Sequence, residues 1–104
     1  MLVKIPREIK IGADSYDIIL KPNLKLREGC VGETKYMCHT ITVDVGLMQD
    51  DKMNTFLHEV LHSIDHAYSC SLDESNIDRM AGGLTEFLRD NLGIEFDWSL
   101  IKEE

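Results

Sequence analysis

The stretch FLHEVLHSIDHAY, residues 56–68, combines a helical pattern of apolar side chains with three histidines and a glutamate. Two of the histidines, His58 and His62, flank Glu59 in the order H-E-x-x-H. Residues four apart lie about 6 Å apart along one face of an α-helix, so both imidazoles can reach one ion. Histidines on a half-buried helical face are costly unless they have partners. The stretch therefore predicts a helix that carries two metal ligands.

Zinc is the metal that this pair of ligands indicates. Zinc binds imidazole nitrogen at about 2.0–2.1 Å in tetrahedral geometry, and a catalytic site keeps a water molecule as the fourth ligand. Glu59 follows His58 directly and is rotated about 100° around the helix axis, so its carboxylate can reach that water rather than the metal. This is the arrangement of a zinc hydrolase. The alternative is a metal-free interaction domain in which His58 and His62 are core residues.

The second half of the chain has the period of two amphipathic helices. From Gln49 the apolar side chains recur at spacings of three and four for about five turns, and the pattern stops near residues 68–71. Ser71 or Asp73 can cap a second helix, which Gly93 would end. The short loop predicts an antiparallel helical hairpin. The expected apolar stripe of the second helix consists of Ile77, Met80, Ala81, Leu84, Phe87 and Leu88.

A third metal ligand is expected from the second helix. His66 is eight residues from His58, about 12 Å along the axis, so one ion cannot bind both. We therefore exclude His66 from the ligand set and expect it at the rim of the site, behind a ligand, or simply on the surface. Glu74 and Asp78 are themselves four residues apart and can both face the first helix. Spacing alone leaves the choice between these two carboxylates open.

The first half of the chain has the period of β-strands. Residues 7–12 alternate, and residues 15–21, after a turn, are rich in β-branched and aromatic side chains. Residues 30–38 and 39–45 form two further candidate strands. We expect residues 21–29 to be a connection, and residues 94–104 have no clear pattern. The fold class is therefore α+β: a small antiparallel or mixed sheet of three to four strands packs on the helical hairpin. Residues 1–104 form a single domain.

Charge and composition restrict the possible partners. The net charge of −8 disfavours binding to nucleic acid, because phosphate contacts need clustered Lys and Arg. No apolar run is long enough for a signal peptide or a membrane span. The three cysteines, Cys30, Cys38 and Cys70, have no disulfide or zinc-ribbon spacing, and a further zinc centre formed by them with His39 is disfavoured. We expect a cytoplasmic protein, and the sequence does not indicate its oligomeric state.

The chain resembles the small zinc metallopeptidases of the ImmA/IrrE type, gluzincin-like proteins common in phages and mobile elements. The resemblance depends on LHEVLHSID, residues 57–65, after the strand TITVD, and on LDESNIDRMAGGL, residues 72–84. It implies a minimal zincin core and a glutamate as third ligand in a pattern similar to E-x-x-[AS]-[DN]. The segment ESNID fits that pattern with Ile77 in the small-residue position. The resemblance thus implies zinc on His58, His62 and Glu74, with Asp78 behind them.

The resemblance also implies the activity. Glu59 would be the base that activates water and then protonates the leaving amine of a protein or peptide substrate. A peptide could add as a strand beside residues 38–44. Tyr68 and His66 are the nearest candidates for an oxyanion stabiliser. If the chain is phage-encoded, it would act in the host cytoplasm.

Two features differ from the family pattern. Leu61 replaces a glycine that is frequent within the H-E-x-x-H motif, and Glu74 follows His62 by a step of only twelve residues. Both differences affect the expected activity more than metal binding. The alternative function is therefore a catalytically silent, zinc-stabilised regulator that binds a protein.

Overall fold

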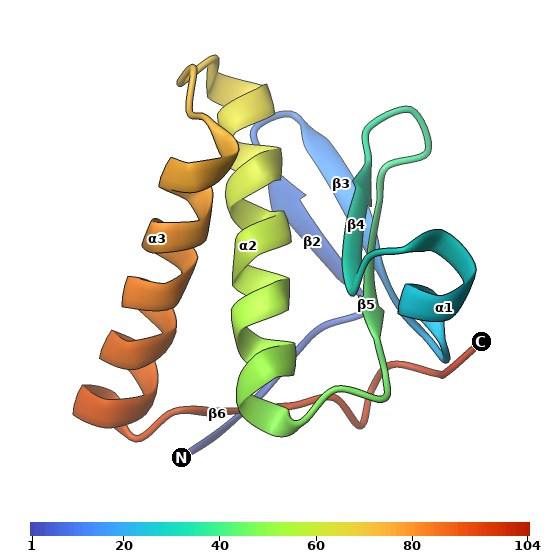
Figure 1. Cartoon of the computed structure of the whole chain (residues 1–104), viewed down its shortest axis with the longest axis vertical. Helices are drawn as coiled ribbons and strands as arrows, with labels where there is room; N and C mark the ends of the chain where they lie inside the picture. Colours follow the sequence, from blue (N-terminus) through green and yellow to red (C-terminus); the bar gives the residue numbers. More distant parts are fainter.

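A computed structural model describes residues 1–104, and its secondary structure is of the α+β class that the sequence predicts (Figure 1). The elements in chain order are β1 (Leu2–Lys4), β2 (Glu8–Ile11), β3 (Asp14–Lys21), α1 (Leu24–Glu28), β4 (Gly32–Lys35), β5 (Thr40–Asp44), α2 (Gln49–Tyr68), α3 (Glu74–Glu86), a π-helical turn (Phe87–Asn91) and β6 (Glu95–Asp97). No helix is long and apolar enough to cross a membrane.

Four strands form the main sheet, in the order β2-β3-β5-β4. The pairs β2–β3 and β4–β5 are antiparallel, whereas β3 and β5 run parallel, so the sheet is mixed. The parallel pairing requires a crossover between β3 and β5, and α1 and β4 provide it. The expected connection at residues 21–29 thus contains a short helix, and β4 becomes an edge strand.

Helix α2 lies between the sheet and α3 (Figure 1). Its sheet-facing side contributes Met53 and Phe56 to a cluster of eleven buried residues, which includes Tyr16, Ile41 and Val43 from the strands. Its opposite side contributes Leu61 to a second, smaller cluster with Ile77 and Ala81 of α3. Helix α2 therefore buries two faces, whereas α3 buries one narrow face.

The expected apolar stripe of α3 was only partly correct. Ile77 and Ala81 are buried, and Leu88 packs against the larger cluster at its edge. In contrast, Met80, Leu84 and Phe87 are 42, 39 and 51% exposed. The reason is that α3 lies at the margin of the molecule and packs on α2 alone (Figure 1), so the rest of its surface faces solvent.

The tail that has no clear sequence pattern completes the core. Strand β6 pairs in parallel with β1, which joins the two ends of the chain below α2 (Figure 1). Phe96 and Trp98 both contact Phe56 of α2 edge to face, with ring centroids 6.0 and 5.3 Å away. Ile101 is buried in the same cluster. These side chains support the underside of the helix that carries the H-E-x-x-H motif.

Candidate metal centre

The two helices of the hairpin bring the candidate ligands together. His58 and His62 lie one turn apart on α2, and Glu74 is the first residue of α3. The side chain of Asp73 caps α3 by accepting a hydrogen bond from the backbone N–H of Asn76 at 2.7 Å. In the loop, the backbone N–H of Leu72 donates to the Asp65 carboxylate at 3.0 Å. These bonds fix the start of α3, and therefore Glu74, against α2.

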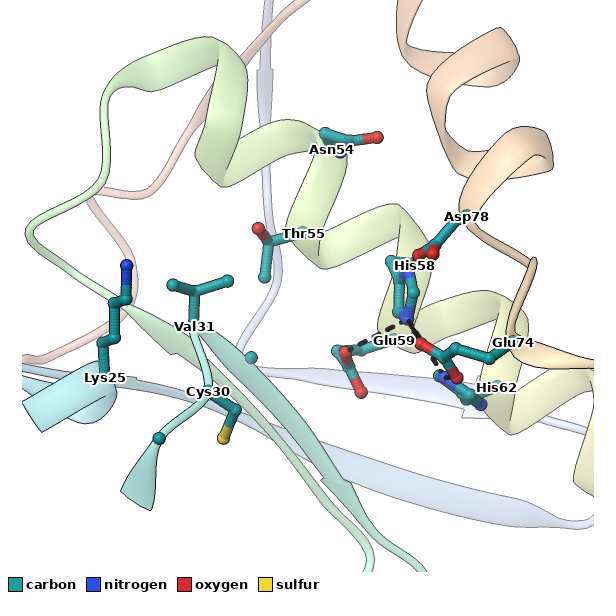
Figure 2. Close-up of a pocket in the computed structure, with 12 residues that line it drawn as sticks. Lys25, Cys30, Val31, Asn54, Thr55, His58, Glu59, His62, Glu74 and Asp78 are labelled. Carbon is teal, nitrogen blue, oxygen red and sulfur yellow. Dashed lines mark hydrogen bonds and ion pairs between the residues drawn. The ribbon is translucent and has the colours of Figure 1, made fainter. Parts of the chain in front are cut away.

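The two imidazoles and the Glu74 carboxylate point toward one position (Figure 2). The Nε2 atoms of His58 and His62 are 3.1 Å apart. The two carboxylate oxygens of Glu74 lie 2.8 Å from His58 Nε2 and 3.0 Å from His62 Nε2. His58 and His62 are largely buried, whereas the side chain of Glu74 is 64% exposed. One ligand therefore closes the cluster from the solvent side.

The spacing of this cluster fits a tetrahedral zinc ion. Ligand atoms at about 2.0–2.1 Å from zinc lie about 3.3 Å from one another when the geometry is tetrahedral. The observed separations between the two imidazole nitrogens and between each nitrogen and Glu74 are a few tenths of an ångström shorter. Small side-chain movements would bring these atoms to the tetrahedral spacing. Two imidazoles and one carboxylate are also a set of donors that zinc prefers. His58, His62 and Glu74 would therefore hold the ion, and a fourth position would remain open.

Asp78 lies behind the cluster rather than in it. Its carboxylate is 2.9 Å from Nδ1 of His58, the ring nitrogen that points away from the other donors. A carboxylate in this position fixes the tautomer and orientation of a ligand histidine. His66 lies outside the cluster, and its ring stacks on Tyr36 with centroids 4.1 Å apart. Neither His66 nor Tyr68 lines the cleft described below.

Glu59 lies beside the cluster and is only 7% exposed. One carboxylate oxygen is 4.0 Å from His58 Nε2, and the other accepts a hydrogen bond of 2.7 Å from the Thr34 hydroxyl. Burial raises the pKa of the Glu59 carboxyl above its usual range. The Thr34 hydrogen bond and the two histidines lower this pKa, and Glu74 raises it. A carboxyl group with a raised pKa next to a group of candidate metal ligands is suited to proton transfer.

The edge strand β4 approaches α2 closely at this point because residue 32 is glycine. A Cβ atom on Gly32 would lie 2.4 Å from the methyl carbon of Thr55 and 3.3 Å from the Glu59 side chain. Two residues further along β4, Thr34 reaches Glu59. The H-E-x-x-H pattern does not indicate either residue, because their role depends on how β4 packs on α2.

A cleft of about 510 Å³ opens beside the donor cluster (Figure 2). It extends from the metal ligands along α2 to the segment that joins α1 and β4, and only two of its twelve lining residues are hydrophobic. Lys25 is the one cationic side chain of the lining. The cleft is thus a polar groove, open to solvent, with the donor cluster and Glu59 at one end.

Cys30 lies in this cleft, close to Glu28 and Glu33. Burial raises the pKa of the Cys30 thiol, and the charges of Glu33, Glu28 and Glu59 raise it further. Cys38 and Cys70 are exposed, and neither forms a candidate metal site with Cys30. The disfavoured zinc centre built from the cysteines and His39 is therefore not assembled.

Comparisons with protein-family models, with curated proteins and with solved structures found no match to this chain.

Proposed function

We propose that this protein is a zinc-dependent metallopeptidase. One observation carries the proposal: donor atoms of His58, His62 and Glu74 all lie within 4.8 Å of one another, and the buried Glu59 carboxylate lies beside them. Two histidines and a glutamate, with an adjacent glutamate as base, are the residues that peptide hydrolysis by zinc requires. The site supports a hydrolase of the ImmA/IrrE type, as the sequence resemblance implies.

Each residue of the site has a distinct role in this proposal. Bound zinc would supply positive charge that polarises a peptide carbonyl and acidifies water. Glu59 would take a proton from the attacking water and deliver it to the nitrogen of the leaving amine, so the carboxylate is regenerated. Asp78 would hold His58 in its ligand tautomer through the 2.9 Å contact with Nδ1. Thr34 would orient Glu59 by its hydrogen bond.

The edge strand β4 is the surface on which we expect a peptide substrate to bind. In the antiparallel pairing of β4 with β5, the N–H of Asp44 donates to the carbonyl of Val31. The backbone groups of Gly32 and Thr34 consequently face the open edge of the sheet. An extended peptide can add there as a further strand. The expectation from sequence that residues 38–44 border the cleft was wrong, because β5 lies between β3 and β4.

The same proposal includes the compartment. All three cysteines are free, which agrees with a reducing cytoplasm, including that of a host cell if the chain is phage-encoded. We propose a protein or peptide as partner rather than nucleic acid, because the net charge is −8.

Replacement of the base tests the proposal. We expect Glu59→Gln to keep equimolar zinc but to lose about 10²- to 10⁴-fold in turnover. The assay is mass-spectrometric detection of new peptide termini after incubation with a protein extract. Glu8→Gln, an exposed change on β2, is the matched control and should behave as the wild type.

Two outcomes would contradict the metallopeptidase. A purified protein without zinc would favour the metal-free interaction domain. Zinc without cleavage, together with unchanged biological function in Glu59→Gln, would favour the catalytically silent regulator that binds a protein.

A further inference from the structure

Helix α3 and the π-helical turn that follows it carry a row of apolar side chains that the rest of the chain leaves partly exposed. Met80, Gly83, Leu84 and Phe87 recur at spacings of three and four, so they share one face, which we call the outer stripe. Helix α3 packs on α2 through a different face, formed by Ile77, Ala81 and Thr85. Helix α3 lies at the margin of the molecule (Figure 1), and Met80, Leu84 and Phe87 of the outer stripe are all partly exposed.

The outer stripe differs from the scattered apolar side chains elsewhere on the surface. Isolated exposed side chains such as Leu26 and Met37 are ordinary in soluble proteins. A row of neighbouring exposed apolar side chains on one helix marks an interaction site. In addition, a Cβ atom on Gly82 or Gly83 would meet nothing within 4 Å. The middle of the stripe is therefore flat and open, which allows another helix to approach closely.

The charges along one edge of the stripe indicate what that other helix is. Arg79 and Glu86 lie seven residues, or two turns, apart on the same edge. Neither makes an ion pair within the chain, and Arg79 bonds only to the hydroxyl of Ser75 at 2.7 Å. Consider a two-fold axis that lies perpendicular to α3, between two copies of the helix and level with the midpoint of Arg79 and Glu86. It would place Arg79 of each copy opposite Glu86 of the other, which gives two ion pairs. The edge is thus complementary to itself.

The apolar residues have nearly the same centre of symmetry. Gly82 and Gly83 lie midway between Arg79 and Glu86, and Gly83 and Leu84 lie midway between Met80 and Phe87. The two midpoints differ by one residue, about 1.5 Å of helix rise, which long side chains can accommodate. In an antiparallel pair of copies, Met80 would face Phe87, and Leu84 would face the open surface of Gly83.

We propose that the protein forms a symmetric dimer through the outer stripes of two antiparallel α3 helices. An interface of this kind uses the same surface on both copies and closes without further growth. The metal centre stays accessible, because Glu74 and Asp78 face α2 rather than the stripe. One pair of helices buries a surface area at the small end of the range known for protein interfaces. The net charge of −8 on each copy also opposes association. We therefore expect a weak dimer, with a Kd on the order of micromolar.

Sedimentation equilibrium over a micromolar concentration series tests the dimer. Leu84→Glu places a charge in the centre of the stripe and should make the protein monomeric throughout the series. Leu26→Glu is the matched control, because Leu26 of α1 is 86% exposed and lies outside the stripe. It should dimerise as the wild type does, with an unchanged circular dichroism spectrum.

Charge exchange tests the orientation of the helices. Arg79→Glu should weaken the dimer about tenfold, because it creates two contacts between like charges. The double variant Arg79→Glu/Glu86→Arg should restore wild-type association, because it recreates both pairs with their signs exchanged. A wild-type protein that stays monomeric would overturn the proposal and assign the stripe to a different partner. The proposal would also be overturned if Leu84→Glu dimerised as the wild type does, or if the double variant dimerised as weakly as Arg79→Glu.

Discussion

A single hydroxyl group, that of Thr34, connects the edge of the sheet to the buried carboxyl group of α2. It lies 2.7 Å from a carboxylate oxygen of Glu59 and 3.3 Å from the backbone oxygen of the same residue. The Glu59 carboxylate accepts no other hydrogen bond, since the Ser63 hydroxyl donates to the backbone oxygen of Glu59. The orientation of the proposed base thus depends on one residue of a different element.

Thr34→Val should destabilise the zinc-free protein, because a buried carboxyl group loses its hydrogen-bond partner while the shape of the side chain is kept. We expect the free energy of unfolding in urea to fall by about 1–3 kcal/mol. Thr34→Ser keeps the hydroxyl and should recover most of this loss. Thr40→Val is the control in the neighbouring strand, where the hydroxyl makes no hydrogen bond within the chain, and an equal loss there would contradict the role of Thr34.

Cys30 should react more slowly with iodoacetamide than Cys38 and Cys70. Its thiol is partly buried, and burial together with Glu33, Glu28 and Glu59 raises its pKa above the usual value, so less of the reactive thiolate is present at neutral pH. Mass spectrometry of labelled peptides would measure the three rates. In Glu33→Gln the rate at Cys30 should increase, and preferential labelling of Cys30 in the wild type would contradict this account.

The sequence indicates the residues of the site to different degrees. His58, Glu59 and His62 are recognisable because they lie on one helix, where spacing determines direction. Spacing did not distinguish Glu74 from Asp78, since the two residues lie one turn apart on the same face of α3. In the structure, the Glu74 carboxylate lies beside the Nε2 atoms of His58 and His62, and the Asp78 carboxylate lies beside Nδ1 of His58. Thr34 could not be predicted, because its contact depends on the position of β4 relative to α2.

Among the elements, β4 and α2 form the contact that shapes the site. Because residue 32 is glycine, β4 lies so close to α2 that the methyl carbon of Thr55 takes the space that a side chain at position 32 would need. Close packing of a strand on a helix through glycine is sensitive to a single added methyl group.

Gly32→Ala should destabilise the protein by about 1–3 kcal/mol, because the new methyl group would lie 2.4 Å from the methyl carbon of Thr55. Thr55→Ser removes that methyl carbon, so the double variant Gly32→Ala/Thr55→Ser should recover part of the loss. Urea denaturation measures both. Gly82→Ala is the matched control, since position 82 is open and alanine favours a helix by up to about 1 kcal/mol. No rescue by Thr55→Ser would contradict the proposed clash.

The length of an element and the location of its partner determine how well the sequence predicts it. Helix α2 is twenty residues long and has a sustained period, so its pattern indicates both its existence and its length. Strands β1 and β6 have three residues each and pair across the whole chain, and no local pattern reports such a pairing. The exposed residues of α3 were assigned to the core because periodicity does not show which face is covered.

At the scale of the whole molecule, the candidate metal ligands come from both helices of the hairpin, His58 and His62 from α2 and Glu74 from α3. The apolar core between α2 and α3 is small: a cluster of three buried residues, Leu61, Ile77 and Ala81, with a few partly buried neighbours. An ion that binds only the folded protein raises the equilibrium constant for folding, by a factor that grows with the ratio of the free ion concentration to Kd. Zinc should therefore stabilise the entire domain, and most of all the attachment of α3.

Zinc at about 100 times its Kd should add about 2.7 kcal/mol to the free energy of unfolding, and Tm should rise by roughly 10 °C or more. Differential scanning calorimetry with zinc, and after its removal by EDTA, measures this shift. The rise should disappear in His62→Ala. A Tm that does not respond to zinc, or an equal response in His62→Ala, would contradict the assignment of the ligands.

The pairing of β1 with β6 has a consequence for synthesis of the protein. Phe96, Trp98 and Ile101 pack beneath α2, yet they follow the helical hairpin in the chain. During translation, all the proposed ligands leave the ribosome before the aromatic residues that support them. A nascent chain that ends near Gly93 would hold the complete hairpin on an unfinished core, and the cleft would take its final form only after the last segment had emerged.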